Sequence, residues 1–250
     1  MAIGPVSGAH YPRAGVRERW PIPPFGVIAG PHMRFDWSDG LDAPRRMRRP
    51  ALLKRAPLPS VPGRPGDAAP AAPPGGHRVA LRVLERADRS EFLRLATESR
   101  DLHRPWTYPP EHADQFEELY ARSRRDDCVC LLACLREGGE IAGVLIVSQI
   151  IRGAFQSAYL GYYVHQRHAG HGFMREAMLQ TVDHAFGPLG LHRLEANIQP
   201  ANRASIALAR SAGFRLEGFS PRYLLIGGQW RDHERYAITA DDRADAGATG

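Results

Sequence analysis

The sequence predicts an α+β domain in which a mixed, mostly antiparallel sheet of about seven strands is flanked by helices, with a disordered tail before it. Short apolar segments with strand periodicity alternate with segments whose apolar residues recur every three to four positions. Helices come early, then a run of adjacent strands, then strand, helix, strand, helix and two strands. This mixed order is typical of an α+β fold, and one domain accounts for it.

The first 77 residues differ in composition from the rest of the chain. They hold 15 of the 21 prolines and carry 11 basic against 5 acidic side chains, whereas residues 78–250 carry 22 of each sign. Because proline interrupts helices and central strands, we expect a Pro/Arg-rich, disordered basic tail over 1–77. A solvated tail is the simplest interpretation, and contact with RNA, a membrane surface or an acidic protein is the alternative. Met33 is an alternative start to Met1.

Cysteine use and the lack of an export signal indicate a location. The longest apolar run near the start, FGVIAG, is too short for a secretory signal, so we expect a cytoplasmic protein with no membrane partner. Cys128, Cys130 and Cys134 share one parity within DDCVCLLACL and have a poor spacing for zinc. We expect them on one face of a strand, as small buried hydrophobic residues.

The first half of the domain, which we expect over 78–240, combines one strand, helical material and a hairpin. Segment 79–85 predicts a strand, and 86–103 and 111–125 predict helical material on either side of the prolines. Segments 128–137 and 140–151 are apolar at both parities and meet at Glu-Gly-Gly. They predict a pair of buried antiparallel strands near the middle of the sheet.

The second half alternates strands and helices. A strand over 157–164 runs into HQRHAGHG, and a helix follows from Phe173 to the Gly-Pro of FGPLG. Segment 192–199 alternates strictly between apolar and polar residues, and the next helix begins near Asn202 and ends at Gly213. A hairpin over 215–239 closes the domain, and we expect residues 241–250 to form a flexible tail.

The glycine turn within HQRHAGHG predicts an anion site. Unpaired backbone N–H groups and the positive end of a helix meet at such a turn. Gly170 and Gly172 remove side chains from the path of a phosphate, and Arg167 adds a charge that can fork onto phosphate oxygens. His168 stands where the dinucleotide fingerprint requires glycine, and no Gly-Lys-Ser/Thr ends the turn, so NAD and ATP are disfavoured. A phosphate or pyrophosphate ligand is expected.

The three histidines of this stretch also suggest a metal site. Residues three apart in a turn do not converge, and no neighbouring Cys, Asp or Glu completes a set of four ligands for His165, His168 and His171. We therefore predict no metal. His168 and His171 are expected to offer backbone N–H groups, with their rings at the surface.

Two motifs and the last hairpin carry a resemblance to a known family. RHAGHG resembles the Q/R-x-x-G-x-G/A pattern of the GNAT acetyltransferase superfamily, and NRASIALARSAGF resembles its second signature, N-x-x-S before a helix ending in Gly-Phe. YLLIGGQWRDHERYAIT is similar to the C-terminal hairpin of the ribosomal-protein-alanine (RimJ-like) branch. The resemblance covers about residues 79–240. It implies the GNAT acyl-CoA N-acyltransferase fold, acetyl-CoA as donor and a primary amine as acceptor.

The resemblance also implies where the donor binds. Its pyrophosphate is expected on the glycine turn, and its pantetheine arm between the strands 157–164 and 192–199. A bulge in the first strand is expected to leave an N–H near Val164 for the thioester carbonyl, and Asn202 is expected to bond the arm near its thiol. The expected cofactor-binding residues are Tyr163, Val164, Arg167, His168, Ala169, Gly170, His171, Gly172, Phe173 and Asn202.

Glu195 is the expected general base. It lies on the polar face of the strand that borders the expected cleft, where Asn197 could position a water. An α-amino group has a pKa of about 8, so only a modest base is required. The alternative for Glu195 is a surface glutamate paired with Arg193 or Arg215.

Two hydroxyl groups are candidates for the proton that the CoA thiolate takes up. Ser205, in the first turn of the helix after Asn202, matches the family position, with helix capping as the alternative. Tyr223 is the second choice, with packing as the alternative. Direct transfer requires no covalent intermediate with the enzyme.

The acceptor is expected to be the N-terminal amine of a protein, as the RimJ-like resemblance implies. Segments 102–111 and 220–232 should build its site, with aromatic surface from Trp106, Tyr108, Tyr223 and Trp230. A small-molecule amine, such as a polyamine, amino acid or aminoglycoside, is one alternative. A non-catalytic acetyl-CoA-binding module is another. The tail is a candidate for ribosome association, and we expect a monomer or a homodimer.

Overall fold

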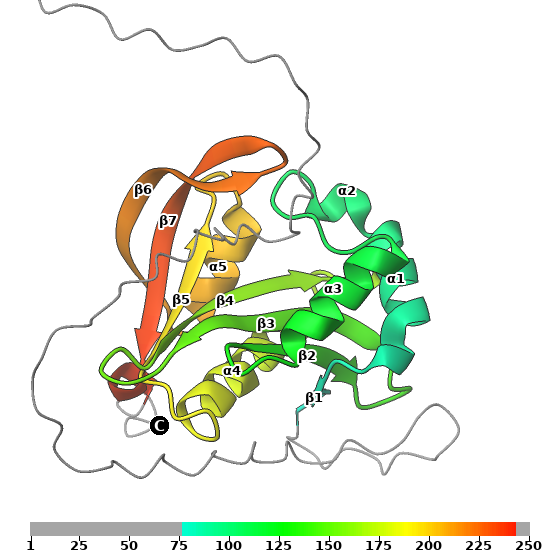
Figure 1. Ribbon diagram of the computed structural model, residues 1–250, viewed down its shortest axis with the longest axis horizontal. Coiled ribbons are helices and arrows are strands. Elements are labelled where there is room, and N and C mark those ends of the chain that lie inside the picture. Colours follow the sequence, from blue (N-terminus) through cyan, green and yellow to red (C-terminus); the bar gives the residue numbers. More distant parts are fainter. Residues whose placement is uncertain (1–76, 244–250) are drawn as a thin grey trace, which may run out of the picture.

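Within residues 77–243, seven strands form one sheet in the order β1-β2-β3-β4-β5-β7-β6 (Figure 1). The computed structural model describes residues 77–243. All neighbouring strands are antiparallel except β4 and β5, which are parallel. The strands are β1 Val79–Val83, β2 Cys128–Leu135, β3 Ile141–Ile151, β4 Ser157–Val164, β5 Arg193–Ile198, β6 Arg215–Ile226 and β7 Gln229–Thr239. The predicted class and strand number are confirmed.

Helices cover both faces of this sheet. Phe92 of α1 and Phe116 of α3 pack against one face, whereas Met178 of α4 and Ile206 of α5 pack against the other. Turns of 3-10 helix stand at 86–88 and 166–168. The α-helices are α1 Arg89–Glu98, α2 Arg100–His103, α3 Ala113–Ser123, α4 Phe173–Phe186 and α5 Arg203–Ser211.

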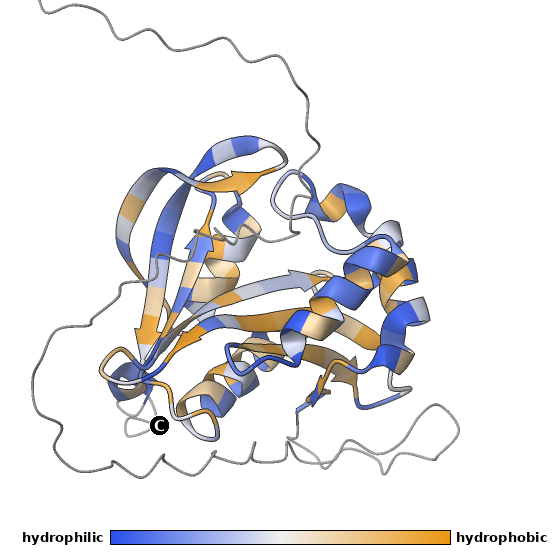
Figure 2. Ribbon diagram, in the orientation of Figure 1, coloured by the Kyte–Doolittle hydropathy of each residue, from blue (hydrophilic) through white to orange (hydrophobic). Residues whose placement is uncertain are grey.

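The apolar character of β2 and β3 follows from this double cover (Figure 2). Leu131 contributes to the core under α4, while Cys130 and Leu132 contribute to the core under α1 and α3. The three cysteines share the second face, as their parity predicts, and burial raises the pKa of each thiol. All three are buried, and none forms a disulfide within residues 77–243.

The strands β4 and β5 separate after a short ladder. Their parallel pairing extends from Ser157 to Tyr159 on β4 and from Arg193 to Glu195 on β5, although both strands continue beyond it. The gap between their later residues is the feature around which the candidate site is built.

The expected bulge in β4 near Val164 is wrong. β4 keeps one register against β3 from Tyr159 to Val164, and the irregularity lies in β3, between Ser148 and Ile151. An extra residue on that strand gives Gln149 a left-handed φ of 52°. Such a bulge redirects side chains, and Ser148 and Gln149 both line the cavity described below.

The C-terminal boundary also differs from the expectation. Asp242 accepts hydrogen bonds from the backbone N–H and the hydroxyl of Thr239, at 2.8 and 2.6 Å, and Arg243 pairs with Asp183 at 2.7 Å. Residues 241–243, which were expected in the flexible tail, therefore contact the domain. Residues 1–76 of the predicted tail over 1–77, with its choice of start, and residues 244–250 lie outside the described residues.

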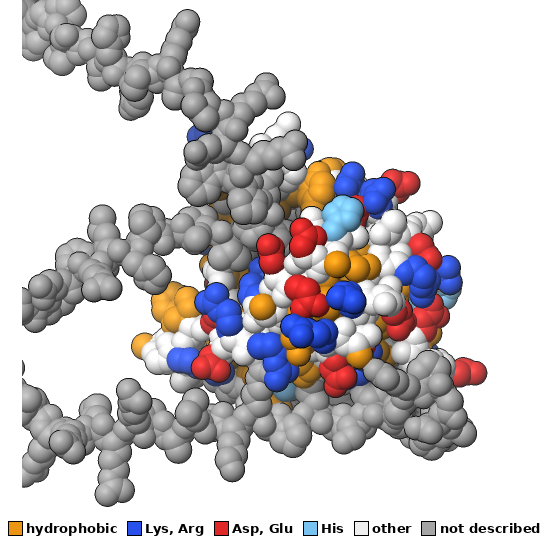
Figure 3. All heavy atoms as spheres, turned by 45° about the vertical axis from the view of Figure 1, so that its right-hand side comes forward, with side chains coloured by type: hydrophobic (Ala, Val, Ile, Leu, Met, Phe, Trp, Pro, Cys, Tyr) orange, Lys and Arg blue, Asp and Glu red, His pale blue; other side chains and the backbone are white. Residues whose placement is uncertain are grey.

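Basic and acidic side chains are interspersed over the face that carries α1 and α3 (Figure 3). This agrees with the equal numbers of the two signs in residues 78–250. Within 77–243, no helix is long and apolar enough to cross a membrane.

Candidate active site

A cavity of about 910 Å³ opens where β4 and β5 separate. On the α4/α5 side of the sheet it is lined by the glycine turn and by the start of α5. On the opposite side, which we call the acceptor side, residues of α2, the loop after α2 and the β6–β7 hairpin line it. One cavity therefore connects the expected phosphate site with the expected acceptor segments.

Backbone amides of β4 point into the gap. The N–H of His165 donates to the carbonyl of Ala142 on β3, at 2.9 Å. Since alternate residues of a strand direct their amides to opposite sides, those of Leu160, Tyr162 and Val164 face the missing part of the β5 ladder. The expected N–H near Val164 does face the gap, because the strands diverge there.

His103 closes the end of this gap. Its Nε2 lies 2.8 Å from the carbonyl oxygen of Val164, so Nε2 carries the hydrogen. Burial lowers the pKa of His103, which favours the neutral ring. The ring of Tyr163 packs edge-on against it at 5.1 Å. Because the amides alternate in direction along β4, the N–H of Tyr163 points toward β3. Tyr163 therefore reaches the cavity through its side chain.

The glycine turn presents fewer N–H groups than expected. Those of His168 and Ala169 donate to the carbonyls of His165 and Gln166 in a 3-10 turn, at 2.9 and 3.3 Å. His168 and Ala169 therefore cannot offer their amides to a phosphate without breaking that turn. The N–H groups of the next three residues make no hydrogen bond to any described residue. These residues are Gly170, His171 and Gly172.

Both of these turn positions require glycine. Gly170 and Gly172 each have φ of +81°, a left-handed conformation that side chains disfavour. Gly172 caps α4, so the unpaired amides stand beside the positive end of a 14-residue helix. The turn is thus built to hold an anion.

Arg78, just before β1, braces this turn from outside the motif. Its Nη2 donates to the carbonyl of His171 at 3.0 Å and its Nε to Glu176 at 2.6 Å. The guanidinium lies 4.7 Å from the ring centroid of Phe173. Phe173 therefore packs beside the turn, outside the cavity lining.

The three histidines of the turn point in different directions. His165 is fully buried, and burial lowers its pKa to about 3. The His171 ring is exposed and stacks on Phe173 at 5.8 Å. The expectation of a surface ring is wrong for His168, whose side chain is 11% exposed and lies 3.4 Å from Glu140. No group of three or more metal-ligating side chains occurs in the described part of the chain.

The arginine expected to bind phosphate lies outside the cavity. Arg167 pairs with Glu98 at 3.1 Å and is absent from the cavity lining, which includes Arg175 instead. Arg175 stands in the first turn of α4, where a cation complements a bound phosphate. Sequence reasoning missed it because the motif ends at Gly172, although its place one turn into the helix was visible.

Asn202 and Ser205 form the start of α5 and line the cavity. The Asn202 carbonyl oxygen accepts from the N–H of Ser205 at 3.1 Å, which caps the helix and leaves the amide NH₂ for a ligand. The Ser205 hydroxyl donates to the hydroxyl of Tyr162 at 2.7 Å, and Tyr162 donates to the Ser205 carbonyl at 3.1 Å. Burial raises the pKa of Tyr162 to about 12. Tyr162 is a second residue that the motifs did not reveal.

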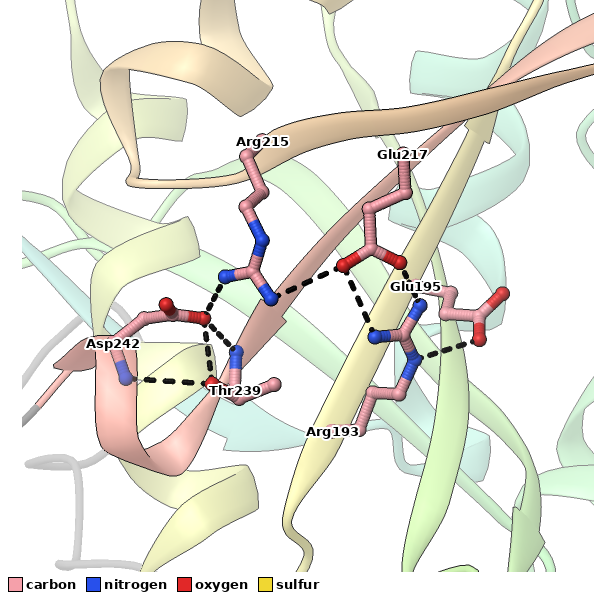
Figure 4. Close-up of polar contacts among 6 residues, drawn as sticks. All are labelled: Arg193, Glu195, Arg215, Glu217, Thr239 and Asp242. Carbon is pink, nitrogen blue, oxygen red and sulfur yellow. Dashed lines mark hydrogen bonds and ion pairs between the residues drawn. The ribbon is translucent and has the colours of Figure 1, made fainter.

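Glu195 lies in an ion-pair network at the last paired position of the β4–β5 ladder, next to the gap (Figure 4). Its carboxylate accepts from Nε of Arg193 at 2.8 Å. Arg193 also pairs with Glu217, and Glu217 pairs with Arg215 at 3.1 Å. Glu195 is not among the residues that line the cavity. The geometry therefore matches the alternative for Glu195, and its role as base stays a prediction without support from its position.

The acceptor side is aromatic and polar. Of the four aromatic residues expected there, Trp106 and Tyr223 line the cavity, whereas Tyr108 and Trp230 do not. Six further residues of the lining are Asn197, Gln199, Gln149, Thr107, Tyr159 and His233. Burial, and then a hydrogen bond with Tyr223, raise the pKa of Tyr159 to about 12.

Nine of the predicted site residues line the cavity. They are Tyr163, Val164, His168, Ala169, Gly170, Gly172, Asn202, Ser205 and Tyr223. Glu195, Arg167, His171 and Phe173 do not.

Comparison with known proteins identifies the family. The family model described as an acetyltransferase (GNAT) domain matches residues 78–215, more than half of the chain. The chain belongs to the GNAT acetyltransferase family. It is an N-acetyltransferase with the predicted GNAT fold.

Individual relatives agree with this identification. The acetyltransferase is 34% identical over 175 residues to the probable N-acetyltransferase YjcK of Bacillus subtilis, covering 67% of this chain and 97% of that protein. It is 42% identical over 103 residues to the ribosomal protein uS5-alanine N-acetyltransferase of Escherichia coli, covering 41% of this chain and 53% of that protein.

Among solved structures, the acetyltransferase is similar to Mycobacterium smegmatis RimJ in complex with CoA-disulfide. The TM-score is 0.61 at 30% identity, covering 68% of this chain and 89% of that chain. The spermidine N-acetyltransferase of Vibrio cholerae, in complex with CoA and spermine, has a TM-score of 0.59 at 24% identity, covering 67% and 98%. The latter similarity shows the fold alone.

Proposed function

We propose that this acetyltransferase transfers the acetyl group of acetyl-CoA to the N-terminal amine of a protein. The choice of acceptor rests on the lining of the cavity, which contains no Asp or Glu among residues 77–243. A polyamine brings further ammonium groups along with the reacting amine, and burying one without a carboxylate is costly. A protein N-terminus brings one amine followed by neutral amides, which suit the neutral side chains of Thr107, Gln149 and Gln199.

The described residues fit acetyl-CoA as the donor. The amides of Gly170 to Gly172 and the charge of Arg175 match a pyrophosphate and a further phosphate. The amides of β4 that face the gap match those of an extended pantetheine arm, which would add to the sheet edge as a short strand. A cavity of about 910 Å³ is large enough for the arm and an acceptor.

Different residues of the chain have different roles in acetyl transfer. Acetyl-CoA supplies an activated thioester. An N–H of β4 in the gap, near Val164, orients the thioester carbonyl and stabilises the negative charge that develops on its oxygen. Ser205, held against Tyr162, supplies the proton that the departing thiolate takes up. No covalent enzyme intermediate is needed.

Two relatives represent the two acceptor classes, a protein and a polyamine. The uS5-alanine enzyme of E. coli acts on a protein, and the Vibrio cholerae spermidine enzyme, 26% identical over 162 residues, acts on a polyamine. Identity is higher to the former, though over a shorter stretch.

Thiol release from acetyl-CoA tests the proposal. Purified full-length protein is given a peptide that begins with Ala or Ser, the same peptide with a blocked N-terminus and an internal lysine, or spermidine. We expect release with the free peptide alone. Release with spermidine but not with the peptide would favour the small-amine alternative. Binding of CoA without release from any amine would favour a non-catalytic module.

The basic tail remains a candidate for ribosome contact. Its surplus of positive charge, 11 basic against 5 acidic side chains in residues 1–77, would attract RNA. Co-sedimentation with ribosomes of the full chain, compared with a chain that begins at His77, tests this. Equal sedimentation of both would remove the tail from consideration.

A further inference from the structure

Two hydrogen-bond acceptors face the acceptor side of the cavity without a partner. The side-chain oxygen of Asn197 is buried and accepts from no group within the described residues. His233 is 3% exposed and also lines the cavity. Buried acceptors are normally paired, so this part of the cavity is suited to a ligand that donates N–H groups.

The hydrogen-bonding of His233 determines which of its nitrogens can take a proton. Nδ1 lies 2.9 Å from the carbonyl oxygen of Arg231. A carbonyl only accepts, so Nδ1 carries the hydrogen, and in the neutral ring Nε2 has an unshared electron pair. Nε2 makes no hydrogen bond to any residue in 77–243. Burial lowers the pKa of His233, which favours this neutral form at pH 7.

The sheet places His233 at the edge of the gap on the acceptor side. Ile198 pairs with Glu234, so His233 lies one residue further along β7, beside Gln199. Asn197 pairs with Arg235, and residues two apart on a strand share a face, so His233 and Asn197 face the same side. β5 borders the gap, and β7 is one strand spacing of about 4.8 Å from it.

No acidic residue within 77–243 competes for this role in the cavity. Among residues 77–243 the lining contains no Asp or Glu, and the carboxylate of Glu195, at the last pair of the ladder, accepts a hydrogen bond from Arg193. His103 lines the cavity too, but its Nδ1 is fully buried. His168 also lines it, but its Nε2 is fully buried, whereas Nε2 of His233 is not among the fully buried unpaired atoms of residues 77–243.

We propose that His233 is the general base that removes the proton from the acceptor amine. This assignment rests on the proposed amine acetylation. The amine nitrogen attacks the thioester carbon and forms the C–N bond. As the C–S bond breaks, its electron pair leaves with sulfur, and the proton passes from nitrogen to Nε2 of His233. The thiolate takes a proton from Ser205, solvent takes the proton from His233, and Ser205 regains a proton from solvent.

Burial has the largest effect on the pKa of His233 and lowers it, while the Arg231 carbonyl and the charge of Asp232 partly offset this effect. Tyr223 of β6 lies against the ring, with centroids 6.0 Å apart. The other titratable or charged side chains that face this part of the cavity or flank His233 on β7 are Tyr159, His103, Arg231, Glu234 and Arg235.

The variant His233→Asn tests the role of His233 as a base separately from its hydrogen bond to the Arg231 carbonyl. The asparagine NH₂ can replace Nδ1 as donor to the Arg231 carbonyl, but asparagine has no basic nitrogen. We expect kcat/KM to fall about 100-fold at pH 7, with little change in the melting temperature or in the Kd for CoA. His184→Asn is the matched control, since His184 is a buried histidine of α4 outside the cavity lining, and its activity should be retained.

The pH profile supplies the deciding readout. In the wild type, kcat/KM should show an inflection below pH 6.5, where His233 loses its proton, and a second near the pKa of the amine. His233→Asn should lose the lower inflection. Imidazole added to His233→Ala should restore part of the activity, which a merely structural role does not predict.

Other outcomes overturn the assignment. An unchanged profile in His233→Asn would refute it, and so would loss of the lower inflection in Glu195→Gln with none in His233→Asn. The assay uses whichever amine the wild type accepts. If that amine is spermidine rather than a peptide, the proposed acceptor is wrong while the test of His233 still runs.

Discussion

Gly170 allows the phosphate-binding turn to be tested without removing any side-chain contact. Its φ is +81°, and a Cβ added there meets no atom within 4 Å. The substitution Gly170→Ala therefore introduces a left-handed alanine, which costs about 1–2 kcal/mol, without a steric clash in the free protein. Its effect on CoA binding reports on the backbone of the turn.

Gly153 is a matched control. It lies in the β3–β4 connection with φ of +73°, its Cβ would also meet nothing within 4 Å, and it is absent from the cavity lining. Gly153→Ala should cost stability alone, lowering the melting temperature by about 2–8 °C. It should leave the Kd for CoA unchanged.

Gly170→Ala should weaken CoA binding. If the turn relaxes out of the left-handed region, CoA must restore it, and a cost of 1–2 kcal/mol corresponds to a rise in Kd of about 5–30-fold. The methyl group also occupies space that a phosphate close to the backbone needs. Isothermal titration with CoA and thermal unfolding of both variants measure the two effects. A wild-type Kd in Gly170→Ala, together with the expected stability loss in Gly153→Ala, would refute the role given to this turn.

Three further predictions follow from the structure. Asn202→Ala should lose the cap of α5, which costs about 1 kcal/mol of stability, and should also bind CoA more weakly. Asn202→Asp should keep the cap and lose only CoA affinity. Equal melting temperatures of the two variants would contradict this. Arg175→Ala should raise the Kd for CoA and weaken its salt dependence more than Arg167→Ala does, measured by titration at two salt concentrations; the reverse order would restore Arg167 as the phosphate ligand. The free energy of unfolding should fall as pH drops from 6.5 toward 3, because the unfolded chain takes up a proton that His165, with a folded pKa of about 3, does not. His165 contributes up to about 1.4 kcal/mol per pH unit to this slope. Denaturant unfolding at several pH values should therefore give a shallower slope for His165→Asn than for the wild type.

Much of the fold could be predicted because its signals are local. The double-sided apolar pattern of β2 and β3, the cap at Asn202 and the helix stop at Gly213 depend on residues within a few positions of one another. The glycine turn was found for the same reason, since a strand, two left-handed glycines and a helix are consecutive in the chain.

The proton-transfer residues could not be assigned in the same way. Glu195 has the right parity on β5, but parity does not say where β4 leaves the ladder, and Glu195 pairs at the last position before the strands separate. Arg167 belongs to the motif, yet Glu98 of α1, far away in sequence, holds it outside the cavity. Both depend on packing between distant segments.

The sequence by itself determined the alternation of strands and helices, the anion-binding turn and the family resemblance. Only the tertiary structure decided which side chains meet at the gap. The sheet inserts β7 between β5 and β6, which brings His233 from the last hairpin onto the same face as Asn197, although 35 residues separate them in the chain. Register across non-consecutive strands is set by long-range pairing and burial, so no local pattern predicts that meeting.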